Sequence, residues 1–349
     1  MSRLNVGVIG LGRLGKVYAR DLARTIAETR VVAVADTAAG LAEAIAREHD
    51  VPRSYTDPIE LIRDREVEAV VIVTPTDTHA SLTIAALESG KPTFCEKPPA
   101  ITLPQTFAMR DAAARTRVPL HMGFMRRFDA GYAAAKKKLE SGAIGNAVVF
   151  KSSSRDPFPP SVEYANPKSS GGLILDMGIH DLDLARWFMG EVESVHAIGG
   201  TLVYPQLGAV GDIDNAIVTL RFNTGRLGVV DLSRNGVYGY DIRTELLGDR
   251  GTLQIGYLRE TPILVMKEDG VTHDTVPYFM ERFERAYSAQ LRDFAQNVLA
   301  GTPMSVTIDD GIAALTICLA ATQSRETGRP VALRDFAAAA SKTCRGIAG

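Results

Sequence analysis

Short apolar runs alternate with amphipathic segments along the first third of the chain. The runs lie at residues 4–9, 31–35, 68–73, 92–96 and 118–122. A helical spacing of apolar positions runs through Val17, Leu22 and Ile26 and recurs at residues 41–48, 59–62, 79–89 and 106–116. Continuous apolar strands that alternate with helices predict a parallel sheet covered on both faces.

The pattern changes after Gly123, where strand-like segments become frequent and turn signals separate them. Hairpins are predicted at Asn223-Thr224-Gly225 and Glu268-Asp269-Gly270. The expected strands lie at residues 146–153, 192–199, 215–222, 226–233, 243–247, 251–255 and 263–267, and helices are expected at 130–141, 181–189, 278–299 and 309–327. This arrangement is typical of an α+β domain with a large, mostly antiparallel open sheet.

The change of pattern divides the chain into two expected domains. Residues 1–122 form an α/β domain with a parallel sheet, and residues 123–349 form the α+β domain. The pattern also allows the C-terminal segment to pack back on the first domain. At 349 residues, the chain is long enough for two domains of ordinary size.

Composition and charge narrow the class of protein. Hydrophobic residues make up 46% of the chain and charged residues 23%, which is the balance of a globular protein. The net charge of −2 gives no electrostatic reason to expect nucleic acid or an anionic membrane as a partner. No apolar stretch reaches the length of a membrane span, and no signal-peptide core follows Met1, so we expect a cytoplasmic protein.

Metal and disulfide chemistry are not expected. Cys95, Cys318 and Cys344 are isolated in sequence and lack the paired spacing of a zinc site or of a disulfide framework. The histidines of the strands and loops also lack metal-ligand spacing; these are His121, His196 and His273. We interpret Cys95 and Cys318 as small buried apolar residues.

A glycine-rich turn follows the first predicted strand and opens the first predicted helix. Its sequence is Gly10-Leu11-Gly12-Arg13-Leu14-Gly15. In this context backbone N–H groups and the positive end of the helix can face a pyrophosphate, which predicts a Rossmann dinucleotide-binding domain. The alternative is that the glycines only make a tight turn.

Asp36 ends the second predicted strand, about 20 residues beyond the glycine turn. A carboxylate at this position can accept hydrogen bonds from both ribose hydroxyls of a dinucleotide. Neutral Thr37, Ala38 and Ala39 follow it, so a 2′-phosphate would meet repulsion without a counter-charge. The sequence therefore favours NAD over NADP.

Two later strand ends carry further candidates. Thr74 and Pro75 end the third long apolar run and should lie beside the ribose or the nicotinamide. Nearby His79 either lines this site or only starts a helix. Lys97 follows the next strand between Glu96 and Pro98, which places a cationic group beside a bound cofactor.

The second domain contains a possible partner for Lys97. Asp176 and His180 are four residues apart, so they would share one face of a continuous helix, with Asp183 nearby. A carboxylate beside an imidazole suits proton exchange with an alcohol. The alternative is an N-cap aspartate and a histidine with a structural role. A lysine and a histidine together supply the proton handling and charge stabilisation that hydride transfer to a nicotinamide requires.

With these motifs in place, the chain resembles the glucose-fructose oxidoreductase, inositol dehydrogenase and rhizopine-catabolism (Gfo/Idh/MocA) family over nearly its whole length. The resemblance is carried by Gly10-x-Gly12-x-x-Gly15, Asp36, Thr74-Pro75, Glu96-Lys97-Pro98 and Gly171-Gly172-x-x-x-Asp176-x-Gly178-x-His180. Within the family it is most similar to the inositol 2-dehydrogenases, through residues 123–132, 155–157 and 238–241.

The resemblance implies a role for each matching residue. Lys97, Asp176 and His180 would form the catalytic set, with His180 as proton acceptor. The expected substrate contacts are Lys97, Arg127, Asp156, Asp176, His180 and Tyr240. The expected NAD contacts are Gly10, Leu11, Gly12, Arg13, Leu14, Gly15, Asp36, Thr74, Pro75, Glu96 and Lys97.

Two of these positions keep an alternative. Arg127 could instead pair with Asp129. The inositol enzymes of the family carry asparagine where this chain has Asp156, and an extra carboxylate there could change which pattern of hydroxyls is preferred.

The expected activity is NAD-dependent oxidation of a secondary hydroxyl of a cyclic polyol, with myo- or scyllo-inositol as substrate. The resemblance also implies a homotetramer assembled through the second-domain sheet. The alternatives are a dehydrogenase of a pyranose sugar, an NAD-dependent glycosidase and a non-catalytic NAD-responsive regulator.

Overall fold

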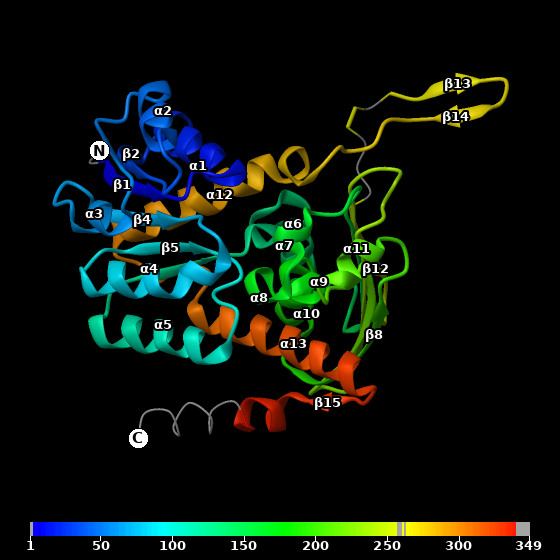
Figure 1. The fold of residues 1–349 in the computed structure, drawn as a ribbon. Helices are drawn as coiled ribbons and strands as arrows, with labels where there is room; N and C mark the ends of the chain where they lie inside the picture. Colours follow the sequence, from blue (N-terminus) through cyan, green and yellow to red (C-terminus); the bar gives the residue numbers. More distant parts are fainter. Residues whose placement is uncertain (1–2, 257–259, 262, 340–349) are drawn as a thin grey trace. The chain divides into compact units, whose positions relative to one another are not determined.

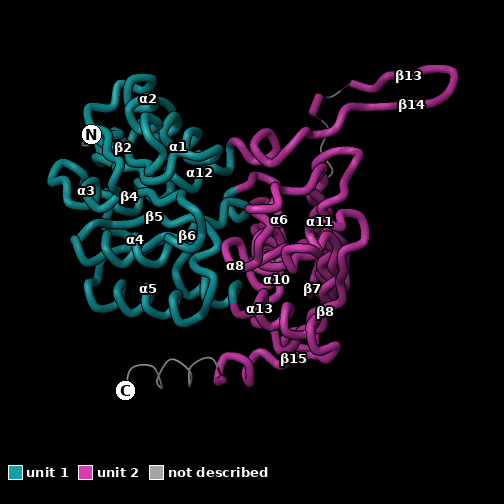
Figure 2. The backbone as a smooth tube through the Cα atoms, in the orientation of Figure 1, with its two compact units in different colours: residues 1–128, 285–315 teal, residues 129–284, 316–349 magenta. Residues whose placement is uncertain are grey.

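The computed structural model describes residues 3–256, 260–261 and 263–339. Its contacts divide the chain into two compact units, each made of two chain segments (Figure 2). The first unit is Met1–Phe128 with Arg285–Leu315, and the second is Asp129–Glu284 with Thr316–Gly349. Sequence pattern alone had suggested a single boundary after residue 122.

The first unit is built on a parallel sheet with strand order β3-β2-β1-β4-β5-β6. Its strands are β1 (Leu4–Ile9), β2 (Thr29–Ala35), β3 (Arg53–Tyr55), β4 (Ala69–Ile72), β5 (Thr93–Glu96) and β6 (Leu120–Gly123). The helices between them are α1 (Arg13–Arg24), α2 (Leu41–Glu48), α3 (Pro58–Arg63), α4 (Thr76–Glu88) and α5 (Leu103–Thr116), and a 3-10 turn, η1 (Met125–Phe128), follows β6. This is the doubly wound order of dinucleotide-binding sheets, as expected.

Helices cover both faces of this sheet. Figure 1 shows α4 and α5 on one face and α1 with α12 (Phe279–Ala300) on the other. All four residues of β4 are fully buried, as the continuous apolar run predicted. The strand order reverses between β1 and β4, so the loops that follow these strands meet at the edge where ligands of such sheets bind.

The second unit contains a larger sheet with strand order β12-β11-β7-β10-β9-β8-β15. Strands β7 and β10 run parallel, and the other neighbouring strands pair antiparallel, as expected. The strands are β7 (Ala147–Arg155), β8 (Val192–Gly200), β9 (Asn215–Phe222), β10 (Leu227–Ser233), β11 (Asp241–Gly248), β12 (Thr252–Gly256) and β15 (Val331–Ala332). Separate from this sheet, β13 (Val265–Lys267) and β14 (Gly270–Thr272) form a hairpin.

Both predicted hairpin turns are confirmed. Asn223-Thr224-Gly225 connects β9 to β10, and Glu268-Asp269-Gly270 connects β13 to β14. The helices of this unit include α6 (Ala130–Glu140), α7 (Val162–Ala165), α8 (Pro167–Ser170), α9 (Gly172–Asp176), α10 (Ile179–Met189), α11 (Pro205–Ala209) and parts of α12 and of α13 (Ile308–Thr327). The shortest of them, α7, α8, α9 and α11, were not predicted because four or five residues carry no measurable periodicity.

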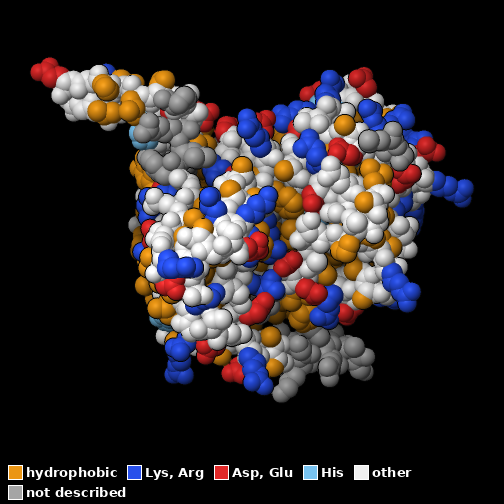
Figure 3. All heavy atoms as spheres, turned by 180° about the vertical axis from the view of Figure 1, so that it is seen from behind, with side chains coloured by type: hydrophobic (Ala, Val, Ile, Leu, Met, Phe, Trp, Pro, Cys, Tyr) orange, Lys and Arg blue, Asp and Glu red, His pale blue; other side chains and the backbone are white. Residues whose placement is uncertain are grey.

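One face of the large sheet is covered by α10 and α13, which contact β7, β8 and β10. On the opposite face, strand residues of β8, β9 and β10 expose large apolar side chains. These are Ile198, Ile217 and Leu227, which are 59%, 44% and 54% exposed. Figure 3 shows hydrophobic side chains gathered along the left margin of the molecule as seen from behind.

Candidate active site

Backbone geometry makes the glycine turn a cradle for an anion. A Cβ on Gly10 would lie 2.6 Å from the carbonyl oxygen of Val73, and one on Gly15 would lie 1.9 Å from that of Gly10. By contrast, no described atom lies within 4 Å of a Cβ built on exposed Gly12. Helix α1 begins after Gly12 with no described side chain capping its first N–H groups. N–H groups at a helix start of this kind can donate to the pyrophosphate of a dinucleotide.

Asp36 is tied directly to the glycine turn. Its Oδ2 accepts a hydrogen bond from the N–H of Leu11 at 2.7 Å, and its Oδ1 accepts one from the N–H of Ala38 at 2.8 Å. The side chain of Leu11 is fully buried, so this residue can face a cofactor only through its main chain. Asp36 therefore fixes the glycine turn, and it follows the carboxyl end of β2, where the sequence predicts the ribose.

His79 joins the two loops that follow β4 and β5. It lies inside α4, which begins three residues earlier, and it is 1% exposed. Its Nδ1 lies 2.7 Å from the carbonyl oxygen of Pro98, and its Nε2 lies 2.9 Å from that of Thr74. The helix begins at Thr76 rather than at His79, and a role of His79 in lining the cofactor site stays a prediction. The side chain lies between the Thr74-Pro75 loop and the Lys97-Pro98 loop, and as a neutral imidazole it can donate to only one of the two carbonyl oxygens.

The pKa of buried His79 makes its contribution to the stability of the fold depend on pH. Burial lowers the pKa of His79, outweighing its contacts with Pro98 and Thr74. The unfolded chain therefore takes up a proton near pH 6.5, about the ordinary histidine value, while the folded chain resists it. The stability contributed by neutral His79 is present above about pH 6.5 and is lost as the pH falls through the lower folded-state pKa.

Replacing His79 with glutamine is expected to reduce the free energy of unfolding by about 1–3 kcal/mol at pH 8, because a buried carbonyl loses its partner. The deficit relative to the parent protein should be smaller at pH 5.5, because protonation of His79 in the unfolded chain has by then removed part of that stability. Denaturant unfolding at both pH values measures this. A deficit that stays constant with pH would assign the acid sensitivity to another group.

Lys97 lies directly after a carboxylate that points into the protein. The side chain of Glu96 is buried and accepts hydrogen bonds from the Tyr18 hydroxyl, the Gln290 amide at 3.2 Å and the N–H of Lys97 at 3.0 Å. Burial raises the pKa of Glu96, and burial also raises the pKa of Tyr18. Glu96 can therefore reach a cofactor only through its main chain, while its carboxylate fixes the backbone that carries Lys97.

In the second unit, Asp176 and His180 do not share one continuous helix, so that premise of the sequence interpretation is wrong. Asp176 ends α9, and His180 lies in the first turn of α10. The helix is interrupted at Gly178, where a Cβ would lie 2.6 Å from the carbonyl oxygen of Ile174. His180 is 7% exposed, whereas Asp176 is half-buried.

Asp176 takes part in a polar cluster that the sequence did not suggest. The Tyr164 hydroxyl donates to its Oδ1 at 2.9 Å, and the Arg234 guanidinium lies 3.5 Å from its Oδ2. Arg234 also pairs with Asp212 at 3.3 Å. Burial raises the pKa of Asp212, and the charge of Arg234 opposes that rise. No local motif marks these residues, because 58 positions separate Asp176 from Arg234 in the sequence.

The other expected substrate residues lie in three different settings. Arg127 lies in η1 of the first unit and pairs with Asp310 at 3.2 Å, whereas Asp129 of the second unit pairs with Arg282. Asp156 follows β7, and its N–H donates to the carbonyl oxygen of Ser233 at 2.9 Å. The ring of Tyr240 is 9% exposed and packs edge-on against Tyr278 and Phe283.

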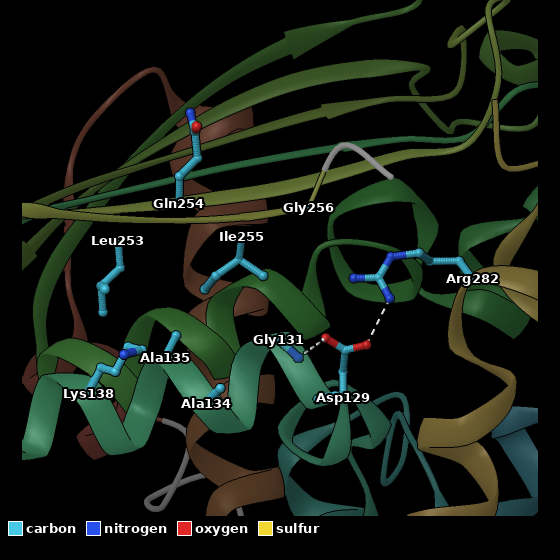
Figure 4. A pocket seen from close by; sticks show the side chains of 11 residues that line it. Asp129, Gly131, Ala134, Ala135, Lys138, Leu253, Gln254, Ile255, Gly256 and Arg282 are labelled. Carbon is cyan, nitrogen blue, oxygen red and sulfur yellow. Dashed lines mark hydrogen bonds and ion pairs between the residues drawn. The ribbon is translucent and has the colours of Figure 1, made fainter. Parts of the chain in front are cut away.

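A pocket of 520 Å³ lies between α6 and β12 (Figure 4). An ion pair between Asp129 and Arg282 lies at one end of it, and Gly131, Ala134 and Ile255 help to line it. It contains none of the residues predicted to bind cofactor or substrate. The chemistry of the glycine turn and of Asp176 is therefore not located in this pocket.

The described residues contain no group of three or more histidine, cysteine, aspartate and glutamate side chains that could hold a metal ion. Among them there is also no helix long and apolar enough to cross a membrane.

The strand order, the glycine cradle and Asp36 define a dinucleotide-binding α/β protein. Residues 4–124 match the family model described as oxidoreductase family, NAD-binding Rossmann fold, and residues 136–333 match that of the C-terminal alpha/beta domain of the same family. The chain belongs to this oxidoreductase family, the Gfo/Idh/MocA family, and the resemblance inferred from its motifs is confirmed.

Individual relatives are similar along nearly the whole chain. A myo-inositol 2-dehydrogenase of Thermotoga maritima is 40% identical, covering 95% of this chain and 99% of that protein. An NAD⁺-dependent scyllo-inositol 2-dehydrogenase of Bacillus subtilis is 39% identical, covering 95% and 96%. The crystal structure of scyllo-inositol dehydrogenase from Lactobacillus casei with bound NAD(H) and scyllo-inositol has a TM-score of 0.91 at 30% identity, covering 95% of this chain and 100% of that one.

Proposed function

We propose that the protein is an inositol 2-dehydrogenase, which oxidises one secondary hydroxyl of myo- or scyllo-inositol to a ketone with reduction of NAD. The observation that carries the proposal is the full-length similarity to two inositol 2-dehydrogenases, at 40% and 39% identity. The cradle at Gly12 and the position of Asp36 support NAD as the cofactor.

The proposed reaction needs a hydride acceptor, a proton acceptor and a group that stabilises charge on the substrate oxygen. NAD, when bound, supplies the acceptor for the hydride that leaves the substrate carbon. His180 takes the hydroxyl proton, and the Lys97 ammonium stabilises the charge that develops on the oxygen. Asp176 orients His180. The products are the ketone, NADH and one proton.

The proposed cofactor contacts follow the loops that the first unit brings together. Backbone N–H groups of residues 10–15 hold the pyrophosphate, and Asp36 accepts from the ribose. Thr74 and Pro75 lie beside the nicotinamide ribose, in a loop held by His79. For the substrate we retain Arg127, Asp156 and Tyr240 as contacts, in addition to Lys97, Asp176 and His180. We also propose a cytoplasmic location, where turnover would have access to the cellular NAD pool.

The test is NADH formation with a panel of substrates and both cofactors. Myo-inositol, scyllo-inositol and pyranose sugars are each supplied with NAD and with NADP, and absorbance of the reduced nicotinamide is followed. We expect turnover with an inositol and a clear preference for NAD. Preference for a pyranose would redirect the assignment to a sugar dehydrogenase, and release of sugar from a glycoside without net NADH would identify a glycosidase. No reduction across the panel would refute the proposal.

We further propose that the exposed face of the large sheet is the surface through which copies of this chain assemble into a homotetramer. Ile198 and Ile217 are directly opposite each other on β8 and β9, and Leu227 extends the apolar surface onto β10. Exposed apolar surface spread over neighbouring strands is typical of a protein interface.

Replacing Ile217 with aspartate is expected to shift the protein from tetramer towards smaller species, because a charge would be buried at the interface. Light scattering coupled to size-exclusion chromatography measures the mass. The matched control is Leu299→Asp, which adds the same charge at a similarly exposed residue of α12. Equal masses for both variants and the parent protein would contradict the proposed surface.

A further inference from the structure

We propose that Tyr164 and Arg234 are positioning residues that hold the carboxylate of Asp176 in one orientation for the reaction. This inference rests on the proposed function, because it takes Asp176 as the partner of His180. Neither residue belongs to the motifs from which the family was identified.

Arg234 is anchored independently of Asp176. Its side chain is 2% exposed, and its N–H donates to the carbonyl oxygen of Asp214 at 2.9 Å. A guanidinium stays charged even when buried, so it requires compensating carboxylates. Asp212 supplies one at 3.3 Å and Asp176 the other at 3.5 Å.

Asp212 and Arg234 contact the two ends of α9, the short helix that carries Asp176. Asp212 Oδ1 accepts a hydrogen bond at 2.9 Å from the N–H of Leu173, in the first turn of α9. A Cβ on Gly172 would lie 2.7 Å from this oxygen, so glycine permits the close approach. Arg234 contacts the last residue of α9. The Asp212–Arg234 pair therefore sets the position of a helix too short to be stable by itself.

Tyr164 contacts the carboxylate oxygen of Asp176 that Arg234 does not face. Its hydroxyl donates to Oδ1 of Asp176, whereas Arg234 faces Oδ2. The charge of Asp176, together with burial of the hydroxyl, raises the pKa of Tyr164, so the phenol remains a donor at neutral pH. With a separate partner on each oxygen, rotation of the carboxylate is restricted, and Asp176 presents a fixed geometry while His180 gains and loses a proton.

The arrangement explains why Arg234, a charged residue whose side chain is 2% exposed, is buried beside α9. A purely structural ion pair would require only Arg234 and Asp212. The additional approach to Asp176, and the donation from half-exposed Tyr164, connect that pair to the proposed catalytic carboxylate.

Tyr164→Phe is the mildest test, because it removes one hydroxyl from a residue that is 54% exposed. It should lower kcat about tenfold, the lower end of what a hydrogen bond to a charged group contributes, with KM for NAD unchanged. In the Asp176→Asn background, the same change should alter kcat less than twofold, since residues that act through one group are not additive. Arg234→Lys should retain more activity than Arg234→Met.

The matched control is Tyr204→Phe. Tyr204 is half-buried in the same unit, and its hydroxyl donates to Asn235 at 3.0 Å. This variant should keep the parent kcat. Equal activity of the two phenylalanine variants, or a tenfold loss that persists in the Asp176→Asn background, would overturn the positioning role.

Denaturant unfolding gives a readout that does not depend on turnover. The effects of Tyr164→Phe and Asp176→Asn on the midpoint should be non-additive, and strict additivity would show that Tyr164 does not hold Asp176. A parent protein that reduces no NAD with any polyol would instead refute the proposed function, and the unfolding result would still decide the positioning role.

Discussion

Lys97→Met is expected to lower kcat by about 10²–10³-fold, the cost of removing one group that stabilises developing charge. Methionine is one atom shorter than lysine, so it keeps most of the side chain without its charge, and it leaves the hydrogen bond from the N–H of residue 97 to Glu96 intact. NAD affinity should therefore stay close to that of the parent protein. Steady-state kinetics with inositol and a direct titration of NAD measure the two quantities separately.

The control for this variant is Lys91→Met. Lys91 precedes the same strand, β5, and its ammonium donates to the carbonyl oxygen of Asp64. It lies at the amino end of the strand, whereas Lys97 follows the carboxyl end, so its loss should leave kcat unchanged. If Lys97→Met abolished NAD binding, Lys97 would belong to the cofactor site and its proposed role towards the substrate would be wrong.

Gly15→Ala is expected to destabilise the first unit and to abolish detectable NAD binding. The added methyl group would lie 1.9 Å from the carbonyl oxygen of Gly10 and 2.8 Å from its carbon. Both are backbone atoms, so α1 must move away from the glycine turn. Overpacking of this kind costs about 1–3 kcal/mol or more, and we expect a value at the upper end. Denaturant unfolding and isothermal titration with NAD measure the two effects.

Gly12→Ala separates the effect on stability from the effect on NAD binding. A Cβ on Gly12 meets no described atom within 4 Å, so the free protein should unfold at the parent midpoint. If backbone at this position approaches the pyrophosphate, the methyl group should still weaken NAD binding by about tenfold or more. Parent-like NAD affinity in both variants would refute the proposed cradle.

The parallel sheet could be predicted from the sequence because its central strands are continuously apolar. Residues 69–72 form a run that only a strand buried on both faces explains well. Strand β3 was missed, since Arg53-Ser54-Tyr55 is short, polar and at the edge of the sheet. Its pairing with β2 is decided by tertiary structure rather than by local pattern.

The candidate site was predictable where a local motif carries it. The glycine turn and Asp36 have a fixed order and spacing, and the structure joins them by a hydrogen bond. The relation between Asp176 and His180 was not predictable in the same way. Their spacing suggested one continuous helix, whereas the helix that carries Asp176 ends at that residue. A glycine at position 178 was the available sign of that break.

Contacts between residues that are far apart in the sequence could not be inferred from local patterns. His79 connects Thr74 to Pro98 through main-chain carbonyls, which every residue possesses and which leave no trace in composition. Arg234 likewise reaches Asp176 only because β10 ends beside α9, a consequence of the order of strands in the sheet.

The two-segment composition of the first unit affects the order in which it can form on the ribosome. Glu96, His121 and Arg127 contact Gln290, Asp293 and Asp310, which are made more than 150 residues later. Domains at the N-terminus usually fold while synthesis continues. Here the nascent nucleotide-binding domain must wait, with these polar groups still facing solvent or a chaperone, until strands β7 to β12 of the second unit have been translated.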